Sequence, residues 1–119
     1  MTTASFGSSA YELLDRIRAS LDEGHVREVR MFGAIAVMVD DAMAVAVHKD
    51  GSLLVRVDPA EDPRLVESPG ASRAEMGAGR SMGEGWIRVE AGALRSEQSL
   101  CSWLAAATRF LSRRGRAAT

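Results

Sequence analysis

Little in this chain ties it to an oxidising compartment or to a membrane. The 119 residues contain one cysteine, Cys101, which has no second thiol with which to form an internal disulfide. No apolar run approaches the roughly 20 residues that a membrane-spanning helix needs, and the polar start of the chain does not resemble a signal peptide. We therefore expect a cytoplasmic protein with no membrane partner.

Aromatic residues and lysine are also scarce. Aromatic side chains make up 5% of the chain and Lys49 is its one lysine, whereas hydrophobic residues reach 46% and charged residues 26%. This balance is ordinary for a globular protein and excludes a disordered one. A chain of this length can bury one core but not two, so we expect a single domain over residues 1–119 with an ordered core at about 9–114.

Charge of one sign gathers only at the C-terminal end. The whole chain has 15 basic and 16 acidic residues, but its last twelve positions hold no acid and four arginines, namely Arg109, Arg113, Arg114 and Arg116. Cations at a helix C-terminus offset the helix dipole by about 0.3–1 kcal/mol, which accounts for such an end without a ligand. The same arginines are candidate nucleic-acid contacts, although the net charge of −1 argues against a nucleic-acid-binding protein.

Apolar spacing predicts a helix near each end of the chain. The first covers residues 9–23, where apolar residues recur at intervals of three and four, and Ser9 and Glu12 have the spacing of a capping box. The second covers residues 96–114 and begins at Ser96, a favourable N-cap. Each helix therefore has one apolar stripe with which to cover a core.

A period of two predicts four consecutive strands between these helices. They cover residues 26–31, 34–39, 43–47 and 53–57. Connections this short force neighbouring strands to be antiparallel, so we expect a meander. The Asp50-Gly51 pair between the last two strands predicts a type I′ turn, which needs positive φ angles.

Both faces of the central strands are apolar. Strict alternation places larger residues on one face, namely Ile35, Val37, Val39, Met43, Val45 and Val47. It places mostly small residues on the other, namely Ala34, Ala36, Met38, Ala44 and Ala46. Because a solvated face is normally polar, the small-residue face predicts close packing of a helix or of a second copy of the chain. Alanine tolerated on a wet surface is the alternative interpretation.

The C-terminal half adds three elements before the last helix. Residues 59–67 predict a short helix that Asp58 caps, residues 68–85 a glycine-rich loop, and residues 86–90 a further strand. The expected fold is therefore α+β and has two layers. An antiparallel sheet of about five strands, the four-strand meander plus one later strand, is covered by the N- and C-terminal helices.

No residue pattern predicts catalysis, a metal or a cofactor. The loop over residues 77–85 offers backbone amides and the Arg80 guanidinium to an anion, but it lacks both the P-loop ending and the dinucleotide-binding glycine spacing. His25 and His48 have no partners at metal-ligand spacing, and Cys101 has no histidine near it in the sequence. We expect a protein that is not an enzyme and holds no cofactor.

Two short elements carry a resemblance to a known family. Met31-Phe32-Gly33 closes the first strand, and Gly79-Arg80-Ser81-Met82 precedes Trp86. Together with the strand pattern between about residues 11 and 111, they resemble the TfoX/Sxy N-terminal domain family. The resemblance marks seven motif positions in this chain, namely Met31, Phe32, Gly33, Gly79, Arg80, Met82 and Trp86.

The resemblance implies an α+β fold in which helices lie against an antiparallel sheet. It also implies kinship with regulators of natural competence, whose longer members add a C-terminal domain that we do not expect here. Our leading interpretation is a small regulatory module that binds an unidentified protein partner and forms a homodimer through its sheet. Two alternatives stay open: weak DNA association through the C-terminal arginines, and sensing of a small anion at the loop over residues 77–85.

Overall fold

The computed structural model describes residues 8–21, 26–31, 33–40, 42–75 and 82–117. In chain order its elements are α1 (Ser8–Ser20), β1 (Val26–Met31), β2 (Ala34–Val39), β3 (Ala42–His48), β4 (Leu53–Arg56), α2 (Asp62–Leu65), β5 (Ala71–Arg73), β6 (Trp86–Val89), the 3-10 helix η1 (Ala91–Leu94) and α3 (Glu97–Ala117). In this described part of the chain, no helix combines the length and the apolar content that crossing a membrane requires.

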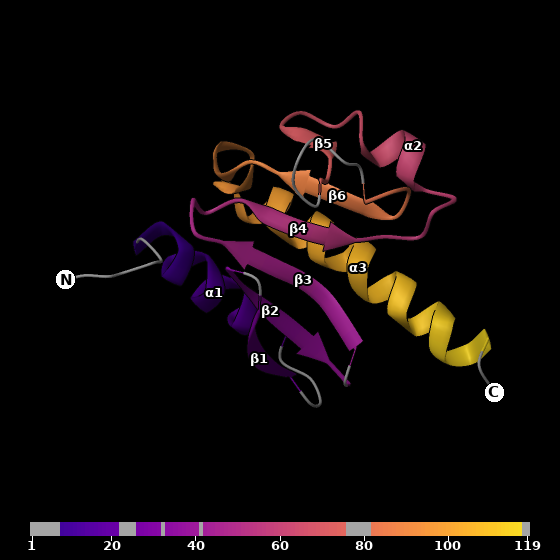
Figure 1. Cartoon of the computed structure of the whole chain (residues 1–119), viewed down its shortest axis with the longest axis horizontal. Coiled ribbons are helices and arrows are strands. Elements are labelled where there is room, and N and C mark those ends of the chain that lie inside the picture. Colours follow the sequence, from indigo (N-terminus) through magenta and orange to yellow (C-terminus); the bar gives the residue numbers. More distant parts are fainter. Residues whose placement is uncertain (1–7, 22–25, 32, 41, 76–81, 118–119) are drawn as a thin grey trace.

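The strands form one antiparallel sheet in the order β1-β2-β3-β4-β6-β5. The predicted meander is confirmed, and β6 joins it by pairing with β4. The sheet also contains β5, a strand within the region predicted to be a loop, which pairs only with β6. Figure 1 shows β1 and β5 at opposite edges of the sheet and α3 crossing behind β4 before its end projects past the sheet.

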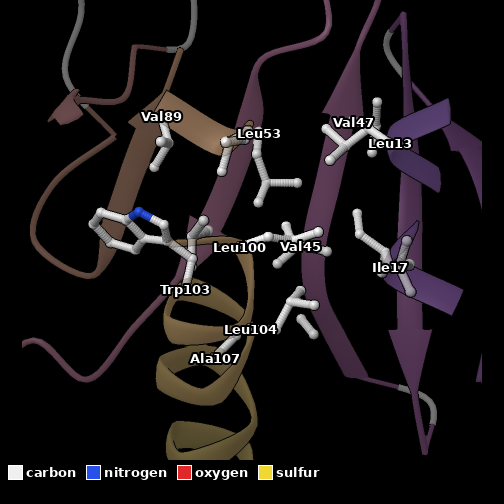
Figure 2. Packing of buried hydrophobic residues seen from close by; sticks show 14 of the residues in the cluster. Leu13, Ile17, Val45, Val47, Leu53, Val89, Leu100, Trp103, Leu104 and Ala107 are labelled. Carbon is white, nitrogen blue, oxygen red and sulfur yellow. The ribbon is translucent and has the colours of Figure 1, made fainter. Parts of the chain in front are cut away.

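Helices α1 and α3 cover the same face of the sheet and enclose the main core. Leu13 and Ile17 of α1 pack with Val45 of β3 and with Leu100 and Leu104 of α3, and all five are nearly inaccessible to water. Figure 2 shows these side chains meeting between the helices and the strands. The predicted α+β fold with two terminal helices over a sheet is therefore confirmed.

The two long helices begin differently. The hydroxyl of Ser96 accepts a hydrogen bond from the Ser99 backbone N–H (N···Oγ 3.0 Å), so the predicted cap of α3 is confirmed. Helix α1 begins at Ser8, which places Ser9 inside the helix. The prediction of a capping box at Ser9 and Glu12 is therefore wrong, because Ser9 is already a helical residue.

Two short connections also differ from expectation. Gly51 has a φ of +84°, and its N–H donates to the His48 carbonyl at 3.0 Å. Together with the His48 N–H to Ser52 carbonyl bond of 3.0 Å, this makes a three-residue loop in place of the predicted type I′ turn. Helix α2 spans only Asp62–Leu65, shorter than the predicted 59–67. Asp58 accepts from the Ala60 N–H at 2.9 Å, so it caps the turn that precedes the helix and not the helix itself.

Candidate functional site

The face of the sheet opposite the helices carries a second apolar cluster. The strand pairing aligns Ala36 with Ala46, Ala46 with Leu54, and Leu54 with Arg88. Ala34, Ala36 and Ala46 are 7%, 0% and 3% exposed, and they pack with Leu54 and Ala74. The floor of this face is therefore sealed within the chain, and alanine tolerated on a wet surface is not the arrangement found.

A β-bulge changes which residues of β3 belong to this face. Val37 is opposite Val45, but Met38 is opposite Met43, so one extra residue, Ala44, lies in β3. Ala44 packs in the main core beneath the helices, whereas Met43 packs against the second cluster. The prediction that Ala44 shares a face with Ala36 is wrong, because strict alternation fails at the bulge.

Large apolar side chains surround the alanine floor. Met38, Met43, Met82 and Trp86 are each half-buried and pack against the cluster, and we call these four residues the methionine rim. Because the alanines themselves are sealed, any protein that docks on this face meets the rim first. The predicted self-association through Ala34, Ala36, Met38, Ala44 and Ala46 stays a prediction, and within that set Met38 is the member accessible on this face.

An open hollow of about 760 Å³ lies on the same face, beside the rim. Leu54, Ala74 and Met82 contribute apolar walls, and His48 and Lys49 stand at the end of β3. Hollows of about 300–1,000 Å³ hold small ligands or the side chains of a partner. The hollow therefore extends the apolar rim into a mixed polar and apolar recess.

Polar groups of the hollow are held by their own neighbours. Asp50 accepts from the Ser52 hydroxyl at 2.7 Å, from the Ser52 N–H at 2.9 Å and from Arg88 Nη2 at 2.9 Å. These bonds, led by that of the Ser52 hydroxyl, keep the pKa of Asp50 below its ordinary value. Burial lowers the pKa of His48, the Asp50 charge acts to raise it, and the Arg88 charge lowers it further. The neutral imidazole is therefore the main form at pH 7.

A buried carboxylate fixes the strands that carry the rim. Asp62 is 0% exposed and accepts hydrogen bonds from the Gly85 N–H (2.8 Å) and from the Arg73 guanidinium. Arg73 ends β5 and Gly85 precedes Trp86 of β6, so one side chain of α2 ties both strands together. Sequence reasoning missed Asp62, because an acid on a short helix is normally solvent-exposed.

Trp86 also stacks with the guanidinium of Arg56, which contacts both the strand layer and the helix layer. The Cζ atom of Arg56 lies 5.1 Å from the centroid of the Trp86 ring and 5.3 Å from that of Phe110 on α3. Arg56 and Trp86 are opposite each other on β4 and β6. The rim residue Trp86 is thus positioned by a strand neighbour that also contacts the helix layer.

The family-motif positions that the structure describes, namely Met31, Gly33, Met82 and Trp86, lie at strand ends or in the connections beside them. Met31 is the last residue of β1, and Gly33 follows with a φ of +76°, where glycine avoids the strain of a side chain. Met82 N–H donates to the Ala74 carbonyl at 2.9 Å, and Trp86 begins β6. Phe32, Gly79 and Arg80 lie outside the described residues, as does most of the candidate anion loop.

The C-terminal arginines that the structure describes are engaged within the chain. Arg109 Nη2 lies 2.7 Å from Glu61 Oε1, and Arg113 Nη1 lies 2.9 Å from Asp58 Oδ2 and 3.1 Å from Glu61 Oε2. The side chains of Arg114 and Arg116 lie outside the described residues. Two of the four candidate nucleic-acid contacts therefore form ion pairs with acidic residues that precede α2.

The remaining candidates are scattered. Cys101 is exposed on α3, with its sulfur 4.0 Å from the Ser20 hydroxyl, and His25 lies outside the described residues. His48 lines the hollow beside the rim, whereas Cys101 lies on α3, so the structure does not bring these two residues into one site.

Comparisons with known proteins give one match. The model of the TfoX N-terminal domain family matches residues 17–111, which is most of the chain and confirms the resemblance drawn from the motifs. No curated protein and no solved structure matches it. The family match supports a regulatory or interaction module in general.

Proposed function

Because the chain belongs to the TfoX N-terminal domain family, we propose that it is a non-enzymatic regulatory module that binds a partner protein through the methionine rim. The observation that carries this proposal is the asymmetry of the sheet. Both of its faces are apolar, but α1 and α3 cover only one of them. The other face keeps Met38, Met43, Met82 and Trp86 half-exposed around a sealed floor.

Methionine suits a surface that receives a partner. Its unbranched, polarizable side chain adapts to irregular apolar shapes, and tryptophan and methionine are enriched at the centres of protein interfaces. The hollow beside the rim offers apolar walls at Leu54 and Ala74 and polar groups at Lys49 and Arg88. The expected partner segment is therefore apolar at its centre and polar at its flanks.

The alternatives receive less support from the geometry. A DNA-associated role needs arginines that can contact phosphates, whereas Arg109 and Arg113 already form ion pairs with Glu61 and Asp58. The anion-sensor alternative depends on the loop over residues 77–85, most of which lies outside the described residues, and in the hollow Arg88 is paired with Asp50 and Arg73 with Asp62. We therefore propose no cofactor and no nucleic-acid partner.

Site-specific photo-crosslinking in the host cell tests the proposal. A benzophenone amino acid replaces Met38 or Met43 on the rim and, as a matched control, the exposed Gln98 on α3. We expect one defined heavier species from the two rim positions and none from Gln98. A species of twice the chain's mass would identify a second copy as the occupant in place of a partner. Absence of any adduct from both rim positions contradicts the proposal.

A further inference from the structure

Strand β1 forms an edge of the sheet that is long enough to pair again. It has six residues and pairs with β2, whereas the opposite edge strand, β5, has three. No other described strand pairs with β1. Within the described part of the chain, its outer side therefore faces no further strand, which is the condition under which an edge can add another strand.

The charges on β1 are of mixed sign, which distinguishes it from an edge protected against pairing. Protected edges carry charges that repel a second copy, but β1 reads Arg27, Glu28, Val29, Arg30. Glu28 and Arg30 are opposite Val37 and Ile35 of β2, so both lie on the face that the helices cover. Arg27 and Val29 lie on the other face.

Symmetry limits the ways in which two copies of β1 can pair. A two-fold axis normal to the sheet makes the two copies of β1 antiparallel. Opposite residues in such a pair lie on the same face, so they differ by an even number of positions in the sequence. The axis must therefore lie at a residue that is opposite its own copy, and not between two residues. An axis at Glu28 places that acid against its own copy. An axis at Val29 places Glu28 of each copy against Arg30 of the other, twice. Charge complementarity therefore selects the axis at Val29.

The neighbouring side chains fit this second register. Arg18 Nη1 on α1 lies 2.6 Å from Glu28 Oε2, and Arg30 Nη2 lies 3.5 Å from the Tyr11 hydroxyl. Tyr11 is 44% exposed, the one large hydrophobic residue so exposed in the described part of the chain. In the pair, the Glu28 carboxylate lies between its own Arg18 and the second copy's Arg30, and Tyr11 flanks the contact. Exposed tyrosine beside paired charges is typical of an interface.

We propose that two copies of the chain associate through β1, antiparallel and with Val29 on the two-fold axis. The two six-stranded sheets become one sheet of twelve strands, with the helices of both copies on one side. Backbone hydrogen bonds along the edge give the affinity, and the two Glu28–Arg30 pairs fix the register. The association leaves the methionine rim uncovered, so it does not depend on the partner proposed above.

Disulfide trapping tests the register. In a Cys101→Ser background, Val29→Cys places two thiols directly opposite, with Cα atoms about 4.5–5.5 Å apart, within the range of about 4.4–6.8 Å that a disulfide spans. The matched control is Arg27→Cys on the same face, whose two copies would lie about four residues apart along the strands, roughly 14 Å. We expect oxidised dimer from Val29→Cys and monomer from Arg27→Cys. Equal cross-linking of both, or none at Val29→Cys, overturns the proposal.

Charge exchange tests the pairing independently. By sedimentation equilibrium, Glu28→Arg or Arg30→Glu alone should weaken dimerisation by about tenfold or more, because like charges then stand opposite. The double variant Glu28→Arg/Arg30→Glu should restore it, and this restoration excludes misfolding as the cause. A wild-type chain that stays monomeric at high concentration, or a double variant as weak as the singles, overturns the proposal. A monomeric Glu28→Arg chain should still give photo-crosslinked adducts from the benzophenone at position 38. The loss of dimerisation can therefore be distinguished from a loss of partner binding at the methionine rim.

Discussion

The Gly85 backbone N–H donates to Oδ2 of Asp62 at 2.8 Å, and Asp62 is fully buried. The other carboxylate oxygen accepts from Arg73, whose side chain is one-third exposed. A buried carboxylate is stable only when its oxygens are satisfied. This pair of bonds therefore joins α2, β5 and the start of β6, and it holds the part of the sheet that carries Trp86 and the hollow.

Replacing Asp62 with alanine should destabilise the fold strongly. The change leaves the Gly85 N–H without its acceptor and Arg73 without its counter-ion. We expect a loss of about 3 kcal/mol, the lower end for a broken buried pair, because Arg73 can still reach water. Urea unfolding measures the change. Glu67→Ala, at an exposed acid of the same segment, is the control, and its effect should stay within about 0.5 kcal/mol.

Gly85 and Gly83 offer a matched pair for testing crowding at positive φ. Their φ angles are +97° and +93°, but a Cβ on Gly85 would lie 3.1 Å from the Val57 carbonyl oxygen, whereas a Cβ on Gly83 meets nothing within 4 Å. We expect Gly83→Ala to cost about 1 kcal/mol for the backbone conformation, and Gly85→Ala about 2–3 kcal/mol. Equal losses in thermal unfolding would show that the close approach to Val57 does not matter.

The protonation of His48 should make stability fall as the solution becomes mildly acidic. Burial lowers the pKa of His48 below its ordinary 6.5, so between the folded and unfolded pKa values only the unfolded chain binds the proton. Stability is therefore full above about pH 6.5 and declines as the pH falls toward the folded pKa. His48→Gln should flatten urea-unfolding free energies measured between pH 7.5 and 5.5. His25→Gln serves as the comparison, and an unchanged slope in His48→Gln would contradict the assignment.

Periodicity predicted the elements that alternate clearly and failed where alternation is broken or absent. Strands β1 to β4 and the stripe of α3 follow from side-chain period alone. The bulge at Ala44 does not, because Met43, Ala44 and Val45 are all apolar and any of them can face either core. Strand β5 is invisible as well, because Ala-Ser-Arg has no pattern and becomes a strand only by pairing with β6.

The sequence predicted which face of the sheet carries the candidate site, but not which residues bury the alanines on that face. The small residues of β2 indicated that this face packs against something, and the second cluster agrees. What seals the floor is contributed by Ala74, Met82 and Trp86, which lie far along the chain. Tertiary contacts of this kind leave no local signal, and the same holds for the burial of Asp62.

The stack of Arg56 between Trp86 and Phe110 should be energetically coupled, and a double-mutant cycle can measure the coupling. Both ring centroids lie just over 5 Å from the guanidinium carbon, within the range where cation–π attraction contributes about 0.5–2 kcal/mol. Arg56→Met keeps the aliphatic contact and removes the charge, and Phe110→Leu removes one ring. If the stack joins the strand layer to α3, the two losses should be non-additive by at least about 0.5 kcal/mol in urea unfolding. Arg88→Met with Phe110→Leu is the matched control, because Arg88 on the neighbouring strand pairs with Asp50, and these losses should add. Additive losses for Arg56 and Phe110 would mean that Phe110 does not help to hold the guanidinium, and that the rim is positioned without help from this contact with the helix layer.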